Sequence, residues 1–191
     1  MRVLVDREIV LGVSGGVAAY KAAALASLLV QRGAGVTAVL TANARRFVGA
    51  ATFAALTGRP VATRSFDPSA HPLGAHIELT ARADLVVVAP ASADVLAKAA
   101  AGAADDLLTT LLLCAECPVL MAPAMNTAMW EKPAVQRNVA RLSDDGIGIV
   151  PPGSGWLSCR RQGAGRMAEP EEIARAIEAT LSERAPRSTT P

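Results

Sequence analysis

Apolar and polar positions follow two different periods along the first forty residues. Residues 8–13, apolar after the initial Glu8, form a run that stops at the small residues of a turn, 14–16. Residues 17–32 have the composition of a helix, and Gly33 closes it. Residues 36–41 carry no charge, as is typical of a strand covered on both faces. The pattern predicts a strand, a tight turn, a helix and a parallel strand, which is a βαβ unit.

The same alternation continues to the end of the chain. Residues 84–89, with the sequence DLVVVA, are the clearest strand, and Pro90 is expected to end it. The other expected elements are an edge strand at 61–64, strands at 118–122 and 147–150, and helices at 43–56, 93–101, 104–114, 133–145 and 170–183. The order predicts a Rossmann-like doubly wound parallel sheet in a three-layer α/β/α domain, residues 1–184. Residues 151–168 are expected to be a long Gly-rich loop, and residues 185–191 a disordered tail.

Composition narrows the class of protein. Of the 191 residues, 51% are hydrophobic but only 3% aromatic, which favours close helix-on-sheet packing and leaves apolar surface for subunit contacts. The net charge of +2, with no basic run along an aromatic stripe, argues against a nucleic-acid partner. Asp6, Arg7 and Glu8 stand where a signal peptide is apolar, and no stretch of about 18 apolar residues occurs. We therefore expect a cytoplasmic protein with no membrane partner.

Three cysteines in such a chain are expected to be reduced thiols. Cys114 and Cys117 form a C-x-x-C that ends a helix, whereas the redox motif begins one. No paired ligands lie nearby in the sequence for zinc, so no metal is expected. Cys159 lies in a Gly-rich segment with three arginines, which is a surface loop or a lid.

Ligands of doubly wound sheets bind beyond the carboxyl ends of the strands, so the turns there are the candidate sites. The turn 14–16 precedes a helix, and its N–H groups, with the Ser14 hydroxyl as an extra donor, suit an anion such as phosphate. The spacing is not that of a dinucleotide fingerprint, and a simple chain reversal is an alternative. Residues 90–94 follow the best strand, and capping of the next helix is their simplest role.

Taken together, six segments resemble the homo-oligomeric flavin-containing cysteine decarboxylases. That family includes phosphopantothenoylcysteine decarboxylase and the decarboxylases of peptide natural products. The resemblance spans residues 9–176. Its segments are GVSGGVAAYK at 12–21, HIEL at 76–79, ADLVVVAPASAD at 83–94, ADDLLTT at 104–110, PAMNTAMW at 123–130 and CxxxGxGRM at 159–167.

The resemblance implies FMN as cofactor and a homo-oligomer, either a trimer or a dodecamer built from trimers. It implies that His76 is the active-site histidine, that Asn126 binds the substrate carboxylate, and that Cys159 lies on a flap over the substrate. Phosphate, ribityl chain and flavin ring would be held by Ser14, Gly15, Thr41, Ala91, Ser92, Ala93, Asp94 and Met125.

The implied chemistry is an oxidative decarboxylation. A cysteine carboxylate has no electron sink, and oxidation of the C–S bond to a thioaldehyde by FMN supplies one. Loss of CO₂ then gives an enethiol. His76 would transfer a proton, and Asn126 would orient the carboxylate.

Two substrates remain open. Cys159 favours phosphopantothenoylcysteine, the substrate in coenzyme A biosynthesis. Arg160 stands where the family has glycine, and the sequence stops at residues 187–191, whereas many bacterial coenzyme A decarboxylases are fused to a ligase domain. Together these two features slightly favour a peptide that ends in cysteine. A non-catalytic flavin-binding regulatory subunit is a further alternative. A third possibility is a flavin prenyltransferase of similar fold, but that function would not explain the PAMN run or Cys159.

Overall fold

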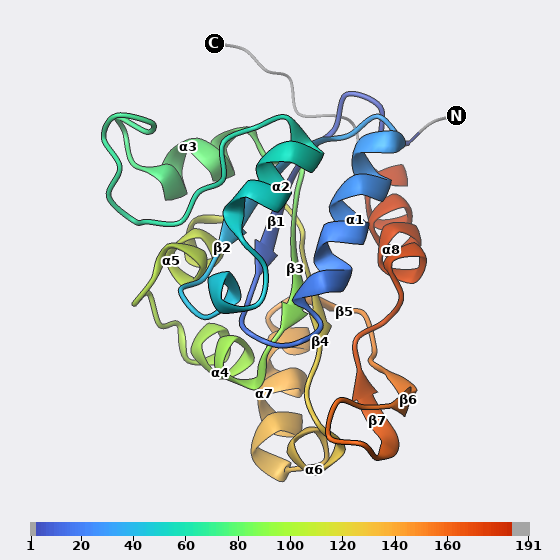
Figure 1. Cartoon of the computed structure of the whole chain (residues 1–191). Coiled ribbons are helices and arrows are strands. Elements are labelled where there is room, and N and C mark those ends of the chain that lie inside the picture. Colours follow the sequence, from blue (N-terminus) through green and yellow to red (C-terminus); the bar gives the residue numbers. More distant parts are fainter. Residues whose placement is uncertain (1–2, 185–191) are drawn as a thin grey trace.

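A five-stranded parallel sheet forms the centre of the structure, a computed structural model that describes residues 3–184 (Figure 1). Its strands are β1 (Glu8–Val13), β2 (Gly35–Leu40), β3 (Leu85–Ala91), β4 (Val119–Pro123) and β5 (Gly148–Ile149). They lie in the order β2-β1-β3-β4-β5. In this doubly wound order the strand sequence reverses between β1 and β3, where ligand crevices form. The predicted fold class is confirmed.

Helices cover both faces of the sheet (Figure 1). One layer contains α1 (Ala19–Gln31), α2 (Ala50–Thr57) and α8 (Pro170–Ser182), and the other contains α3 (Ala75–Arg82), α4 (Ala93–Ala101), α5 (Leu107–Cys114) and α7 (Pro133–Asp144). Alternate residues of a strand point to opposite layers, so Leu11 packs with the first layer and Val10 with the second. Within residues 3–184, no helix is long and apolar enough to cross a membrane.

Two expectations about strands were wrong. Pro90 does not end β3, which runs on to Ala91 through a cis Ala89–Pro90 bond, and the pairing with β4 shifts register there. The edge strand expected at 61–64 is reduced to one bridge between Ala62 and Val39, so that segment only touches the sheet edge. The tail expected at 185–191 lies outside the described residues.

The Gly-rich segment is ordered, contrary to the expected loop. It contains an antiparallel hairpin of β6 (Gly153–Trp156) and β7 (Gln162–Arg166). At its tip, the Arg160 N–H donates to the Leu157 carbonyl at 2.9 Å. Arg160 has a φ of +62°, a left-handed conformation that costs an L-residue roughly 1–2 kcal/mol. Arginine therefore occupies a position whose backbone favours glycine, and the turn is still formed.

A buried ion pair lies at the amino ends of the central strands β1 and β3. Arg7 Nη1 lies 3.2 Å from Asp84 Oδ1, and both side chains are almost fully buried. The second oxygen of Asp84 accepts the Glu8 N–H at 2.8 Å, while Arg7 Nη2 donates to the Leu181 carbonyl at 3.1 Å. The pair thus links the start of β1, the residue before β3 and the end of α8.

We expect Asp84→Ala to lower the free energy of unfolding by about 3–5 kcal/mol, because it leaves the buried Arg7 guanidinium without its counter-charge. Urea denaturation monitored by circular dichroism measures this loss. Asp84→Asn is the matched control, since its amide oxygen still accepts the Glu8 N–H, and its loss should be smaller. An unchanged denaturation midpoint for Asp84→Ala would show that the pair does not stabilise the fold.

Candidate cofactor and substrate site

The first turn provides an anion cradle at the carboxyl edge of the sheet. Among the described residues, the backbone N–H groups of the four residues 15–18, which lie between β1 and α1, have no hydrogen-bond partner. A Cβ added to Gly16 would meet nothing within 4 Å, so the cradle is open. Gly15 lies against Asn43, where a Cβ would stand 2.5 Å from the Asn43 Cβ. Consecutive free N–H groups before a helix fit the phosphate of FMN.

The Ser14 hydroxyl has a different role from the extra donor that was expected. It is buried, donates to the Pro90 carbonyl at 2.7 Å and accepts the Ser92 N–H at 2.9 Å. The hydroxyl hydrogen is therefore engaged in a hydrogen bond within the protein, and this bond links the end of β1 to the end of β3. Ser92 Oγ in turn accepts the Val95 N–H at 3.4 Å, so Ser92 caps α4.

The other residues assigned to the cofactor lie on neighbouring loops of the same edge. The Thr41 N–H donates to the Val13 carbonyl at 3.1 Å, which holds the end of β2 beside the end of β1. Ala91 ends β3, and Ala93 begins α4. Asp94 is exposed and pairs with Lys98 at 3.2 Å, so its carboxylate has a partner on its own helix.

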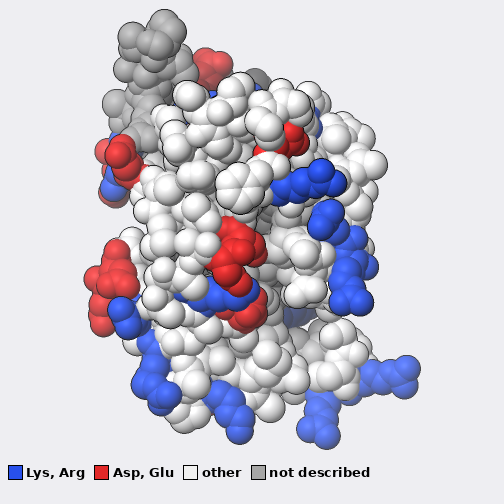
Figure 2. Space-filling view, turned by 90° about the vertical axis from the view of Figure 1, so that its left-hand side faces the viewer, with Lys and Arg blue, Asp and Glu red and all other residues white. Residues whose placement is uncertain are grey.

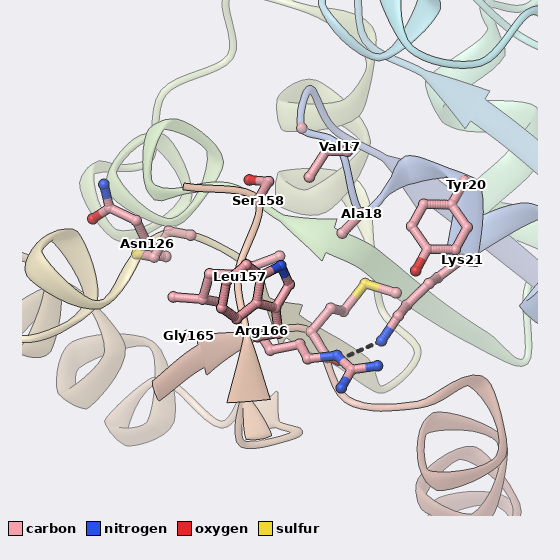
Figure 3. A pocket seen from close by; sticks show the side chains of 14 residues that line it. Val17, Ala18, Tyr20, Lys21, Asn126, Leu157, Ser158, Gly165 and Arg166 are labelled. Atoms are coloured by element: carbon pink, nitrogen blue, oxygen red, sulfur yellow. Dashed lines mark hydrogen bonds between the residues drawn. The ribbon is translucent and has the colours of Figure 1, made fainter. Parts of the chain in front are cut away.

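A cavity of about 390 Å³ lies beside the first turn (Figure 3). Its walls come from residues 16–18 before α1, from Met125 and Asn126 after β4, and from residues 156–158 and 165–167 of the hairpin region. The structure thus brings Met125 and Asn126 next to the anion cradle. The remaining assigned residues do not line this cavity.

Asn126 is held in a defined orientation. It is the N-cap of the short helix α6 (Thr127–Trp130), and its Oδ1 accepts the Met129 N–H at 2.8 Å. Because the oxygen is used as an acceptor, the two N–H donors of the amide remain for a ligand in the cavity. An amide donor in a largely apolar cavity suits a carboxylate, which it orients without neutralising its charge.

Two glycines let the hairpin backbone lie directly on this segment. A Cβ on Gly163 would stand 2.2 Å from Thr127 Oγ1, and a Cβ on Gly165 would stand 2.4 Å from the Met125 carbonyl oxygen. At the same places, the Met125 N–H donates to the Gly165 carbonyl at 2.9 Å, and Thr127 Oγ1 donates to the Ala164 carbonyl at 2.8 Å. The glycines of the CxxxGxGRM run are therefore required by contact, and the hairpin forms one wall of the site.

Lys21 and Arg166, which were not predicted as site residues, line the cavity on the side opposite Asn126 (Figure 3). Lys21 is buried and donates to Glu169 Oε1 at 2.9 Å and to the Met167 carbonyl at 3.2 Å. Arg166 also contacts Glu169, at 2.8 Å. The hydrogen bond from Lys21, followed by the charges of Lys21 and Arg166, lowers the pKa of Glu169 against the opposing effect of burial. A lysine as the lone charge within residues 17–31 was the available signal, since a charge on an apolar helix needs a partner.

Asn126 lines the cavity, whereas His76 and Cys159 do not. His76 is on α3, in the helical layer opposite α1, and Figure 1 shows α3 and the hairpin at opposite corners of the fold. Its Nδ1 is buried and has no hydrogen-bond partner among the described residues. Cys159 is exposed at the hairpin tip, one residue beyond Ser158, which lines the cavity.

The chain belongs to the Flavoprotein family, whose match covers residues 2–182. It is 52% identical over 170 residues to the coenzyme A biosynthesis bifunctional protein CoaBC of Mycobacterium tuberculosis, covering 88% of this chain and 40% of the relative. It is 47% identical over 178 residues to CoaBC of Bacillus subtilis, covering 93% and 44%. The chain therefore spans less than half the length of these curated relatives.

Two solved structures carry the same fold. The FMN-dependent cysteine decarboxylase SpaF is 36% identical, with a TM-score of 0.81, and the match covers 94% of this chain and 98% of that one. A PPC decarboxylase variant in complex with pantothenoylaminoethenethiol is 32% identical, with a TM-score of 0.83 and coverage of 93% and 99%. The resemblance to flavin-containing cysteine decarboxylases is confirmed.

We expect Gly165→Ala to loosen the hairpin, because the new Cβ would strike the Met125 carbonyl and alanine tolerates the φ of +114° poorly. The cost should be about 1–3 kcal/mol. Hydrogen exchange of the Met125 amide, which is bonded to Gly165, measures the effect and should become faster. Gly153→Ala in β6 is the control, since its Cβ would meet nothing closer than 4.0 Å. Equal exchange in both variants would contradict the proposed contact.

Proposed function

We propose that this chain is an FMN-dependent decarboxylase of phosphopantothenoylcysteine. The observation that carries the proposal is the position of Asn126, which caps α6 through its Oδ1 and lines a cavity adjoining four free backbone N–H groups. That arrangement offers a carboxylate site next to a phosphate site. The similarity to CoaBC and to FMN-dependent cysteine decarboxylases supports it.

The comparisons favour this substrate over the peptide that the sequence slightly favoured. The two curated relatives named above are coenzyme A biosynthesis proteins, at 52% and 47% identity. The structural argument for a peptide rested on Arg160, which replaces a glycine of the family pattern. Arg160 adopts the left-handed conformation and completes the turn with Leu157, so the replacement leaves the hairpin intact.

The residues around the first turn fit FMN. The N–H groups of residues 15–18 would hold its phosphate, and the loops with Thr41 and residues 91–94 would hold the ribityl chain and ring, with Met125 against the ring. When bound, FMN accepts a hydride and so supplies the oxidation that converts the cysteine thiol carbon to a thioaldehyde.

Asn126 would then orient the carboxylate for the loss of CO₂. The electron pair of the C–C bond that breaks moves onto the thioaldehyde sulfur. The amide leaves the carboxylate charged, which keeps its electrons available. Cys159 at the hairpin tip would donate the proton when the enethiol is reduced to the saturated thiol, a reduction for which reduced FMN would return the hydride taken up in the oxidation. This last step distinguishes the coenzyme A product from an unsaturated one.

We further propose a homo-oligomer in which His76 of one copy completes the cavity of another, because α3 lies away from the cavity of its own chain. The region around α3 exposes large apolar side chains, namely Phe66, Leu73 and Ile77. Figure 2 shows uncharged areas above and below a central group of charged residues on the side that carries α3, α4 and α5, with further charged residues along the margins of this face. Such a face suits contact between subunits.

We expect Asn126→Asp to keep the fold and FMN but to lower the rate of CO₂ loss from phosphopantothenoylcysteine by at least about a hundredfold. Aspartate still caps α6, but it places a negative charge beside the substrate carboxylate and removes the donors. Mass spectrometry of the product and the flavin absorption spectrum measure both effects. Normal turnover by Asn126→Asp would contradict the assigned role, and wild-type protein that binds FMN without releasing CO₂ would favour a regulatory subunit.

Two inactive variants test whether His76 acts across a subunit boundary. His76→Asn and Asn126→Asp, each inactive when expressed alone, should recover part of the activity when they are co-expressed, since mixed oligomers contain some cavities with both wild-type residues. The measurement is the rate of CO₂ release per FMN. If both residues served the same chain, mixing would recover nothing.

A further inference from the structure

The wall of the cavity opposite Asn126 carries an unbalanced positive charge. Lys21 Nζ and Arg166 Nη2 both contact the same oxygen of Glu169, Oε1, at 2.9 and 2.8 Å. Two cations therefore share one carboxylate, and Lys21 and Arg166 both line the cavity. The lowered pKa of Glu169 keeps that carboxylate ionised at neutral pH. The three groups together therefore carry a net charge of one positive unit.

Of the two cations, Arg166 has more N–H donors left for a ligand. Lys21 is buried and also donates to the Met167 carbonyl at 3.2 Å. The Arg166 side chain is 42% exposed, and its one ion pair within residues 3–184 is with Glu169. A guanidinium carries five N–H donors in a planar fork, so most of them are available. Gly155 makes room for this group, since a Cβ there would lie 3.2 Å from Arg166 Nη1.

We propose that Arg166 binds the phosphate of phosphopantothenoylcysteine while Asn126 binds its carboxylate. Figure 3 shows Asn126 at one side of the cavity and Arg166 with Lys21 at the other, with Leu157 between them. The substrate matches this polarity, because its two anionic groups stand at opposite ends of an extended molecule. The planar fork of arginine binds phosphate through paired charge-assisted hydrogen bonds. This inference rests on the proposed function and assigns Arg166 as the residue that selects a phosphorylated substrate over a peptide.

The phosphate of FMN is a second anion that could reach this wall, and the two sources can be separated. The cofactor phosphate has its own candidate partners in the four free N–H groups of residues 15–18. If Arg166 served the cofactor, its loss would weaken FMN binding and affect every substrate alike. If it serves the substrate, its loss affects only substrates that carry the phosphate.

The test compares kcat/KM for phosphopantothenoylcysteine with kcat/KM for pantothenoylcysteine, which lacks the phosphate. We expect a clear preference for the phosphorylated substrate in the wild-type holoenzyme and a fall of about tenfold in the ratio for Arg166→Leu. Arg166→Gln, which keeps a polar side chain but removes the charge, should show the same fall if the leucine variant folds poorly. Arg166→Lys should retain part of the preference, and Glu169→Gln should increase it.

Arg161→Leu is the matched control, because it removes the same charge from the same hairpin at an exposed residue outside the cavity. Its ratio should equal that of the wild type. Equal losses on both substrates in Arg166→Leu would show a structural role and overturn the inference, as would loss of FMN with an unchanged ratio. A wild-type ratio near one overturns the inference but leaves the proposed function standing, whereas no turnover of either substrate overturns both.

Discussion

Parallel pairing of β1, β3 and β4 is the constraint on which the candidate site depends. It brings the turns after these strands to the carboxyl end of the sheet, where the anion cradle, residues 91–94 and Asn126 become neighbours. The Ser14 hydroxyl fixes this arrangement locally by bonding both to Pro90 and to Ser92. A register slip of one residue would exchange the two faces of a strand and bury the wrong side chains. The packing of the core therefore also fixes the position of the chemistry.

The hairpin turns an open sheet edge into an enclosed site. Its contact with the residues after β4 is made largely by backbone, since Gly163 and Gly165 leave no room for a Cβ. The Lys21–Glu169 pair then links the segment after the hairpin to α1, beside the anion cradle. The anion cradle, Asn126 and the wall with Lys21 and Arg166 thus come from separate segments of the chain, which explains why the motifs are far apart in the sequence.

Much of the fold was predictable because burial on both faces leaves a clear pattern, as in the DLVVVA run of β3. The hairpin was not, because its glycines and polar residues show no alternation, and backbone bonds and contacts with Met125 and Thr127 hold it instead. Asn126 and Met125 were assigned from the family resemblance and do line the cavity. The position of His76 relative to the cavity could not be predicted, since it depends on tertiary packing.

The most direct test of the account offers wild-type holoenzyme two substrates in one incubation: phosphopantothenoylcysteine and a peptide that ends in cysteine. Mass spectrometry distinguishes the saturated thiol, which has lost only CO₂, from the enethiol, which has lost two further hydrogens. We expect CO₂ loss from phosphopantothenoylcysteine with the saturated thiol as product, and negligible conversion of the peptide. Conversion of the peptide alone would contradict it.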